Sequence, residues 1–113
     1  MCTKNELNSI LQKLTQIYRS VYGENLVQVI LYGSYARGDY HTDSDVDVVA
    51  IVHGDRKTLQ QQLKKVWDSS CELELEYDTI LSPTVIPYEE FKQYQIDLPY
   101  YRNISQEGVV ISA

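Results

Sequence analysis

The chain has 113 residues, of which 43% are hydrophobic and 23% charged, and its formal net charge is −6. This length suits one domain over residues 1–113 and leaves no room for a second catalytic module. The negative charge argues against direct binding of a long nucleic acid, because attraction to phosphates normally dominates that affinity. No apolar stretch approaches the roughly 20 residues of a membrane span, and the polar N-terminus lacks the apolar core of a secretory signal. We therefore expect a cytoplasmic protein that makes no membrane contact.

The first third of the chain predicts a helix and then a buried strand. Apolar residues recur every three or four positions from Leu7 to Val21, which indicates a helix with one buried stripe. Thr3 and Glu6 form a capping box before it, and Gly23 supplies its end. Residues 26–32 (LVQVILY) are almost wholly apolar and rich in β-branched side chains, as is typical of a strand buried on both faces.

The middle of the chain predicts a loop, a second strand, a second helix and a third strand. Residues 33–42 are polar and turn-rich, and residues 45–52 (DVDVVAIV) have the composition of a strand. Asp55 can cap a helix that ends near residues 69–70. Residues 71–81 (CELELEYDTIL) then alternate acidic and apolar side chains, which predicts a strand with one acidic face.

Short elements are expected in the last third. Pro83 and Pro87 punctuate the chain, residues 88–94 predict a short helix, and residues 98–105 predict another helix or turn. A final apolar segment covers residues 109–111. Together the elements predict an α/β (α+β) fold in which a short mixed β-sheet is flanked by helices.

A glycine-serine pair lies at the end of the first predicted strand, and ten residues separate it from the acidic sequence Asp45-Val46-Asp47. Gly33 has no Cβ, so its backbone can approach a ligand closely. Ser34 begins a short turn whose free N–H groups and helix dipole favour an anion. The pair therefore predicts a triphosphate site.

Asp45 and Asp47 are two residues apart on a predicted strand, so both side chains project to one face while Val46 enters the opposite core. Their Cα atoms should lie roughly 6.5 Å apart, and carboxylates at that separation can share ions spaced about 3.5–4 Å. Oxygen-only ligands select Mg²⁺ or Mn²⁺ over zinc. This combination indicates metal-dependent nucleotidyl transfer.

A third carboxylate on the neighbouring strand would bind the metal beside the attacking hydroxyl and act as the general base. The acidic face of residues 71–81 offers four residues of the same parity: Glu72, Glu74, Glu76 and Asp78. We choose Asp78, with Glu76 next, because Asp78 lies deepest in the predicted strand. The earlier glutamates could form a solvated outer face.

The segment GSYARGDYHTDSDVDVVAIV resembles the signature of the minimal nucleotidyltransferase (MNT) group of the polymerase β superfamily. The downstream segments VIPYEEF and YYRNISQEGVVI resemble the tail of its MntA-type antitoxin branch. The resemblance covers nearly the whole chain and implies the nucleotidyltransferase fold. The spacing of Gly-Ser, ten residues and Asp-x-Asp is its specific part, whereas the tail is less specific.

The resemblance also implies a partner, because such antitoxins are encoded beside a HEPN-domain ribonuclease toxin. They neutralise it by transferring AMP from ATP to a toxin tyrosine, so the implied activity is Mg²⁺-dependent protein adenylyltransfer. Position 35 is Tyr where the family often has Arg, and Arg37 can supply the missing triphosphate contact. The implied nucleotide-binding residues are Gly33, Ser34 and Arg37, and the implied catalytic and metal-binding residues are Asp45, Asp47 and Asp78.

Two alternatives remain open on sequence alone. The same core could transfer a nucleotide to a small molecule such as an aminoglycoside, although enzymes of that kind usually carry an additional helical domain. The chain could instead be a catalytically weak antitoxin that acts by stoichiometric contact. A missing third carboxylate would favour this second alternative.

Overall fold

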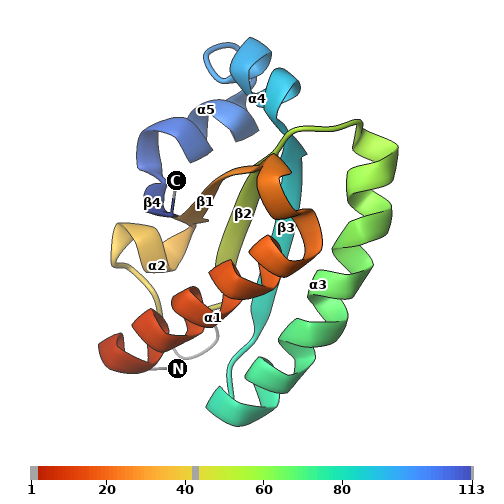
Figure 1. Cartoon of the computed structure of the whole chain (residues 1–113). Helices are drawn as coiled ribbons and strands as arrows, with labels where there is room; N and C mark the ends of the chain where they lie inside the picture. Colours follow the sequence, from red (N-terminus) through yellow and green to blue (C-terminus); the bar gives the residue numbers. More distant parts are fainter. Residues whose placement is uncertain (1–2, 42–43, 113) are drawn as a thin grey trace.

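The centre of the fold is a four-stranded mixed sheet in a computed structural model that describes residues 3–41 and 44–112 (Figure 1). Its strands are β1 (Leu26–Tyr32), β2 (Val46–Val52), β3 (Leu81–Pro87) and β4 (Val109–Ser112). They lie in the order β3-β2-β1-β4. β1 pairs antiparallel with both β2 and β4, whereas β2 and β3 are parallel. The predicted mixed sheet flanked by helices is confirmed.

The first helix, α1 (Lys4–Tyr22), begins at the predicted capping box. The Thr3 hydroxyl accepts a hydrogen bond from the Glu6 N–H (3.1 Å), and the Glu6 carboxylate accepts one from the Thr3 N–H (3.0 Å). These two bonds satisfy backbone donors that the first helical turn leaves unpaired. A short 3₁₀ turn, η1 (Gly23–Asn25), then leads into β1.

Two long helices, α1 and α3 (Arg56–Tyr77), pack together over one face of the sheet (Figure 1). The core on this face includes Leu14 of α1, Leu63 of α3 and Val48 of β2. Tyr18 is fully buried there, and its hydroxyl donates a hydrogen bond to the Thr84 carbonyl oxygen (2.9 Å). Burial raises the pKa of Tyr18 well above its ordinary value, so this phenol stays neutral.

Two shorter helices, α4 (Tyr88–Tyr94) and α5 (Pro99–Glu107), contribute to a second core on the opposite face. Ile30, Val49 and Phe91 are among the buried residues of this core. The short helices predicted for this part of the chain are confirmed. Among residues 3–41 and 44–112, no helix combines the length and apolar character needed to cross a membrane.

The predicted third strand is wrong in its position. Residues 71–77 continue α3, and β3 begins only at Leu81. Glu and Leu are strong helix formers, and the buried stripe of α3 runs on at helical spacing through Ser70 and Leu73. Leu75, which a strand would have buried, is 85% exposed because it lies off that stripe. The alternation of acidic and apolar residues therefore mimicked a strand within a helix.

Candidate active site

The end of β1, the start of β2 and the start of β3 lie at the same end of the sheet, because β1 is antiparallel to β2 and β2 is parallel to β3. Gly33 links β1 to the short helix α2 (Ser34–Arg37). Its carbonyl oxygen accepts hydrogen bonds from the Ala36 and Arg37 N–H groups, both at 3.1 Å. The predicted turn after the first strand is therefore confirmed, and Ser34 is its first helical residue.

The backbone at Gly33 approaches the Asp47 carboxylate so closely that a Cβ at position 33 would collide with it. Gly33 also has φ +77° and ψ −156°, a conformation that residues with a side chain rarely adopt. Both facts explain why glycine is needed here. The chain thus brings the turn and the acidic strand into direct contact.

Asp45 directly precedes β2 and Asp47 is its second residue, and both are half-buried. Val46 between them is fully buried against the α1 and α3 side, so the predicted division of these side chains between two faces is confirmed. Burial raises the pKa of Asp47, and the negative charge of Asp45 raises it further, whereas Arg37 opposes the shift. The two carboxylates therefore repel each other at this site.

Asp78 does not complete the acidic pair. It is the C-terminal cap of α3, with the left-handed φ of 49°, and its side chain is exposed. Within residues 3–41 and 44–112, no group of three or more His, Cys, Asp or Glu side chains could hold a metal ion. The prediction of a third carboxylate at Asp78 depended on a strand that is in fact a helix.

The other acidic residues offered for that role have different partners. Glu76 forms an exposed ion pair with Lys13 (3.2 Å). The Glu74 carboxylate accepts a hydrogen bond from the Leu81 N–H (3.0 Å), which ties the end of α3 to the start of β3. Glu72 is exposed on α3. These contacts give Glu74 and Glu76 structural roles.

The strand that does lie beside β2 presents hydroxyl groups instead. In the parallel register, Ser82 pairs with Asp47, and Thr84 pairs with Val49. The Ser82 hydroxyl donates a hydrogen bond to the Asp45 carboxylate (3.4 Å), and the Thr84 hydroxyl donates one to the Val48 carbonyl oxygen (3.3 Å). Sequence reasoning missed both residues. The β-branched run within residues 81–87 was the available signal, but the prolines obscured it.

A cavity of about 210 Å³ borders the Gly33 turn. Its lining consists of Tyr32, Gly33, Arg37, Tyr100, Asn103, Ile104 and Glu107. The hydroxyls of Tyr32 and Tyr100 lie 3.2 Å apart, and their rings meet edge to face. Burial raises the pKa of Tyr32, so its hydroxyl remains protonated. Neither tyrosine was predicted as a site residue.

Arg37, the predicted triphosphate contact, lines this cavity and is exposed. Its guanidinium forms ion pairs with Asp39 (3.2 Å) and with Glu107 of α5 (3.8 Å). These exposed pairs are weak and can exchange for a phosphate. Arg37 lies beside the Gly33 turn, because its own N–H bonds to the Gly33 carbonyl oxygen.

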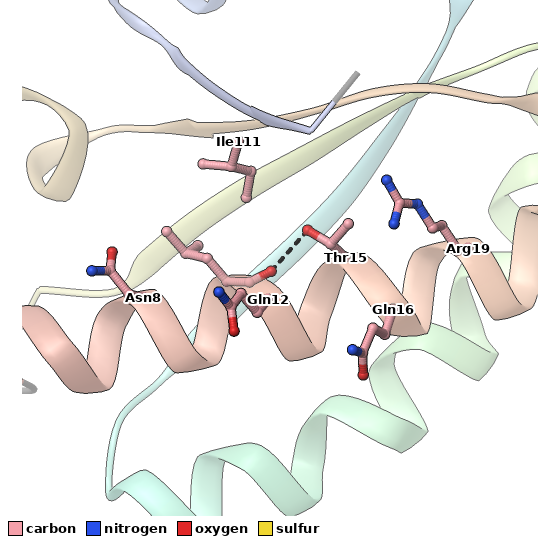
Figure 2. Close-up of a pocket in the computed structure, with 7 residues that line it drawn as sticks. Asn8, Gln12, Thr15, Gln16, Arg19 and Ile111 are labelled. Carbon is pink, nitrogen blue, oxygen red and sulfur yellow. Dashed lines mark hydrogen bonds between the residues drawn. The ribbon is translucent and has the colours of Figure 1, made fainter.

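A second cavity, of about 420 Å³, lies between α1 and the end of β4 (Figure 2). Its polar lining comes from α1 and includes Asn8, Gln12 and Gln16. The Thr15 hydroxyl donates to the Leu11 carbonyl oxygen (2.8 Å). Among the residues that the structure describes, no carboxylate lines this cavity, so it lacks the ligands that a metal-dependent transfer needs.

The oxygen ligands at the start of β2 suit one divalent cation. Asp45 and Asp47 are hard donors, and a cation bound between them would offset both the burial of the Asp47 charge and its repulsion by Asp45, the two causes that raise the pKa of Asp47. A strand, a glycine turn and a short helix set against such a pair define the class of nucleotidyltransferases. The sequence pattern of the nucleotidyltransferase domain matches residues 7–111, and the chain belongs to this family.

Two relatives from Methanocaldococcus jannaschii are provisionally named protein adenylyltransferases. One is 35% identical over 80 residues, which cover 71% of this chain and 79% of the relative. The other is 30% identical over 107 residues, which cover 95% of this chain and 98% of the relative. The chain is therefore a nucleotidyltransferase with protein adenylyltransferases among its relatives.

Two solved structures share the fold at low sequence identity. A toxin–antitoxin structure with AMP-PNP superposes with a TM-score of 0.53 at 16% identity, over 91% of this chain and 70% of the other. A mutant of the toxin–antitoxin complex MntA-HpeT superposes with a TM-score of 0.52 at 14% identity, over 88% and 69%. These similarities establish the shared architecture.

Proposed function

We propose that this chain is a protein adenylyltransferase that acts as the antitoxin of a HEPN-domain ribonuclease toxin. It transfers AMP from ATP to a hydroxyl of that toxin, a tyrosine hydroxyl. The observation that carries the proposal is the close approach of the Gly33 backbone to the Asp47 carboxylate, which places the turn that would bind phosphate beside a carboxylate that could hold a cation. The adenylyltransferase relatives support the reaction, and the shared toxin–antitoxin fold supports the role.

In this proposal the start of α2 binds the triphosphate. Backbone N–H groups beginning at Ser34 point toward the anion, and Arg37 adds a positive charge. Asp45 and Asp47 would hold Mg²⁺ or Mn²⁺ beside the triphosphate. When bound, the cation neutralises charge on the phosphates and stabilises the pyrophosphate leaving group.

The cavity beside the turn is suited to the nucleoside part of ATP. Tyr32 and Tyr100 offer aromatic surface together with hydroxyl groups, and Asn103 offers an amide that can donate and accept hydrogen bonds. A cavity of about 210 Å³ that adjoins the phosphate turn is where the sugar and base of a bound nucleotide would extend.

The transfer itself is a displacement at the α-phosphorus of ATP. The oxygen of the acceptor hydroxyl forms a bond to that phosphorus, and the bond from phosphorus to the oxygen bridging to the β-phosphate breaks. The products are an AMP-modified tyrosine and pyrophosphate, and the proton of the hydroxyl passes to water. Asp45 and Asp47 contribute by positioning and by electrostatics, which supply most of the catalysis in phosphoryl transfer.

A protein acceptor is favoured by the surface beside the nucleoside cavity. Leu98 and Tyr100, at the start of α5, are 43% and 49% exposed, and Ile96 just before them is 75% exposed. Exposed apolar and aromatic side chains that gather near a site often mark a protein interface. A protein that docks here would reach the cavity through Tyr100, which belongs to both.

The proposal expects the neighbouring gene to encode an all-helical protein with an Arg-x-x-x-x-His ribonuclease motif, and the test uses that protein after purification. We expect the wild-type chain with Mg-ATP to add the mass of AMP to that protein, as measured by intact-mass spectrometry. The double variant Asp45→Asn, Asp47→Asn should slow the addition by at least about 100-fold, because it removes both charged cation ligands.

Asp68→Asn is the matched control, since Asp68 is exposed on α3 and its loss leaves the site intact. Peptide mapping of the modified partner identifies the acceptor residue, which we expect to be a tyrosine. A partner that gains no AMP, yet is inhibited equally by the wild-type chain and the double variant, would disprove the enzymatic proposal.

A second candidate function is inhibition of the toxin by stoichiometric contact. It is favoured by one observation, the hydroxyl of Ser82 beside Asp45 where a third carboxylate was expected. Under this alternative, inhibition requires one chain per toxin and does not depend on ATP. Titration of ribonuclease activity with and without nucleotide separates the two functions, because a catalyst inhibits many equivalents of toxin.

A further inference from the structure

Ser82 lies beside the acidic pair in a way that follows from the sheet. Residues paired across parallel strands place their side chains on the same face, and Ser82 pairs with Asp47. Its hydroxyl contacts the Asp45 carboxylate at 3.4 Å. Ser82 is therefore the β3 side chain that reaches the cation-binding carboxylates.

The next β3 residue on that face is already engaged elsewhere. Thr84 pairs with Val49, one step deeper along the sheet, and its hydroxyl donates to the Val48 carbonyl oxygen (3.3 Å). It serves the packing of β3 on β2. On β3, only Ser82 is both level with Asp47 in the strand register and in contact with a carboxylate of the acidic pair.

A hydroxyl in this position, in place of the expected carboxylate, reduces the number of cations that the site can bind. Asp45 and Asp47 are the two carboxylates at this position among the described residues, and together with the phosphates of a nucleotide they could hold one divalent cation. A second divalent cation beside the acceptor hydroxyl needs a further anionic ligand, since a neutral hydroxyl is a much weaker ligand for Mg²⁺ or Mn²⁺. Within residues 3–41 and 44–112 no third acidic side chain joins the pair.

We propose that Ser82 occupies the third cation-ligand position of this site, so that the chain binds one divalent cation with the nucleotide and lacks an acceptor-side cation site. This inference rests on the proposed nucleotide function and specifies its limit. The site then has the cation that accompanies the nucleotide, but it has no cation to activate the acceptor hydroxyl, so that activation is weak. Ser82→Asp supplies the missing carboxylate.

The test counts bound cations directly, with Mn²⁺ as the probe and AMP-PNP as a nucleotide that is not turned over. Electron paramagnetic resonance measures free Mn²⁺ during titration of the wild-type chain, and we expect one bound ion per chain. Ser82→Asp should add a second bound ion, with an affinity at least about tenfold above the residual second binding of wild type. Ser69→Asp on α3 is the matched control for added charge, because Ser69 is exposed.

Two results would overturn the inference. One is a wild-type chain that binds two Mn²⁺ ions with similar affinity, which needs no variant to detect. The other is a Ser82→Asp variant with an unchanged circular dichroism spectrum that still binds only one ion. Because the count requires no acceptor, it can succeed while AMP transfer fails, and transfer can succeed while the count fails, so the two proposals are tested separately.

Discussion

The starts of β2 and β3 lie side by side and in parallel, yet one presents charged carboxylates and the other neutral hydroxyls to the same face of the sheet. The β2 side contributes the carboxylates of Asp47 and of Asp45 just before the strand, whereas β3 contributes the hydroxyls of Ser82 and Thr84. The backbone arrangement is the same in both places. The difference shows that two neighbouring strands can share one register while they offer side chains of different charge to the same face.

The two strand ends also differ in what holds them. Asp47 is in contact with the Gly33 turn and is destabilised in its charged form by burial and by Asp45. At β3, the Thr84 carbonyl oxygen accepts a hydrogen bond from Tyr18, which fastens this strand to α1 on the far face. Charged Asp47 is thus held in an unfavourable environment beside the turn, whereas β3 is tied to the core through Tyr18.

Among the variants that test this difference between β2 and β3, Gly33→Ala should have the largest effect on stability and on Mn²⁺ binding. The substitution forces a side chain into a strained conformation, at a cost of about 1–3 kcal/mol, and also pushes against the Asp47 carboxylate. Gly23→Ala is the matched control, because Gly23 also has positive φ but no atom of the described residues lies within 4 Å of the place its Cβ would take. Urea denaturation should show a greater loss of stability for Gly33→Ala, and Mn²⁺ binding should weaken only in that variant. Equal losses of stability in the two variants would mean that the Asp47 side chain moves aside at little cost and that its contact with Gly33 is unimportant.

The β1, α2 and β2 part of the site could be predicted from sequence because each of its features is local. The buried run before Gly33 and the alternation around Val46 both fix the direction of side chains within a few residues. The β3 residue that lies beside the acidic pair could not be predicted in the same way. It depends on which residue of a distant strand pairs with Asp47, and that register is set by tertiary packing.

The error in the third element also has a local cause. Acidic and apolar residues that alternate satisfy the period of a strand, but Glu and Leu favour a helix, and the helical stripe through Leu73 decides the outcome. The real strand contains Pro83 and Pro87, which is tolerated because β3 is an edge of the sheet. Counting the helical stripe onward from Leu63 and Val66 would have favoured the correct assignment.

A smaller effect is expected from Thr84→Val, which tests whether the β3 end is structural. Valine keeps the shape of the side chain but removes the hydroxyl that donates to the Val48 carbonyl oxygen. We expect a loss of about 1 kcal/mol in the free energy of unfolding, the usual contribution of one such hydrogen bond. Mn²⁺ affinity in the presence of AMP-PNP should stay within about twofold of wild type, far below the change of about tenfold expected where a cation ligand is altered. A large loss of Mn²⁺ affinity in a folded variant would place Thr84 in the cation site and contradict this division between the strands.

The smallest effect concerns the charge of Asp47 and depends on pH. Its pKa is raised in the folded chain, so the folded state binds this proton more tightly than the unfolded state does. The free energy of unfolding therefore falls as pH rises from the ordinary Asp value toward the raised folded value, and the penalty is complete above that window. Asp47→Asn removes the charge, so without divalent cation the variant should be more stable than wild type at neutral pH. The gain should be below about 1 kcal/mol, because the half-exposed carboxylate is partly screened by solvent, and it should vanish in acid.

Urea denaturation across this pH range measures the difference, with Ser82→Ala as a neutral counterpart on β3 that should show no such pH dependence. Mg²⁺ with AMP-PNP should reverse the order, since it stabilises wild type through Asp47, and an advantage of Asp47→Asn that persists under those conditions would exclude Asp47 as a cation ligand.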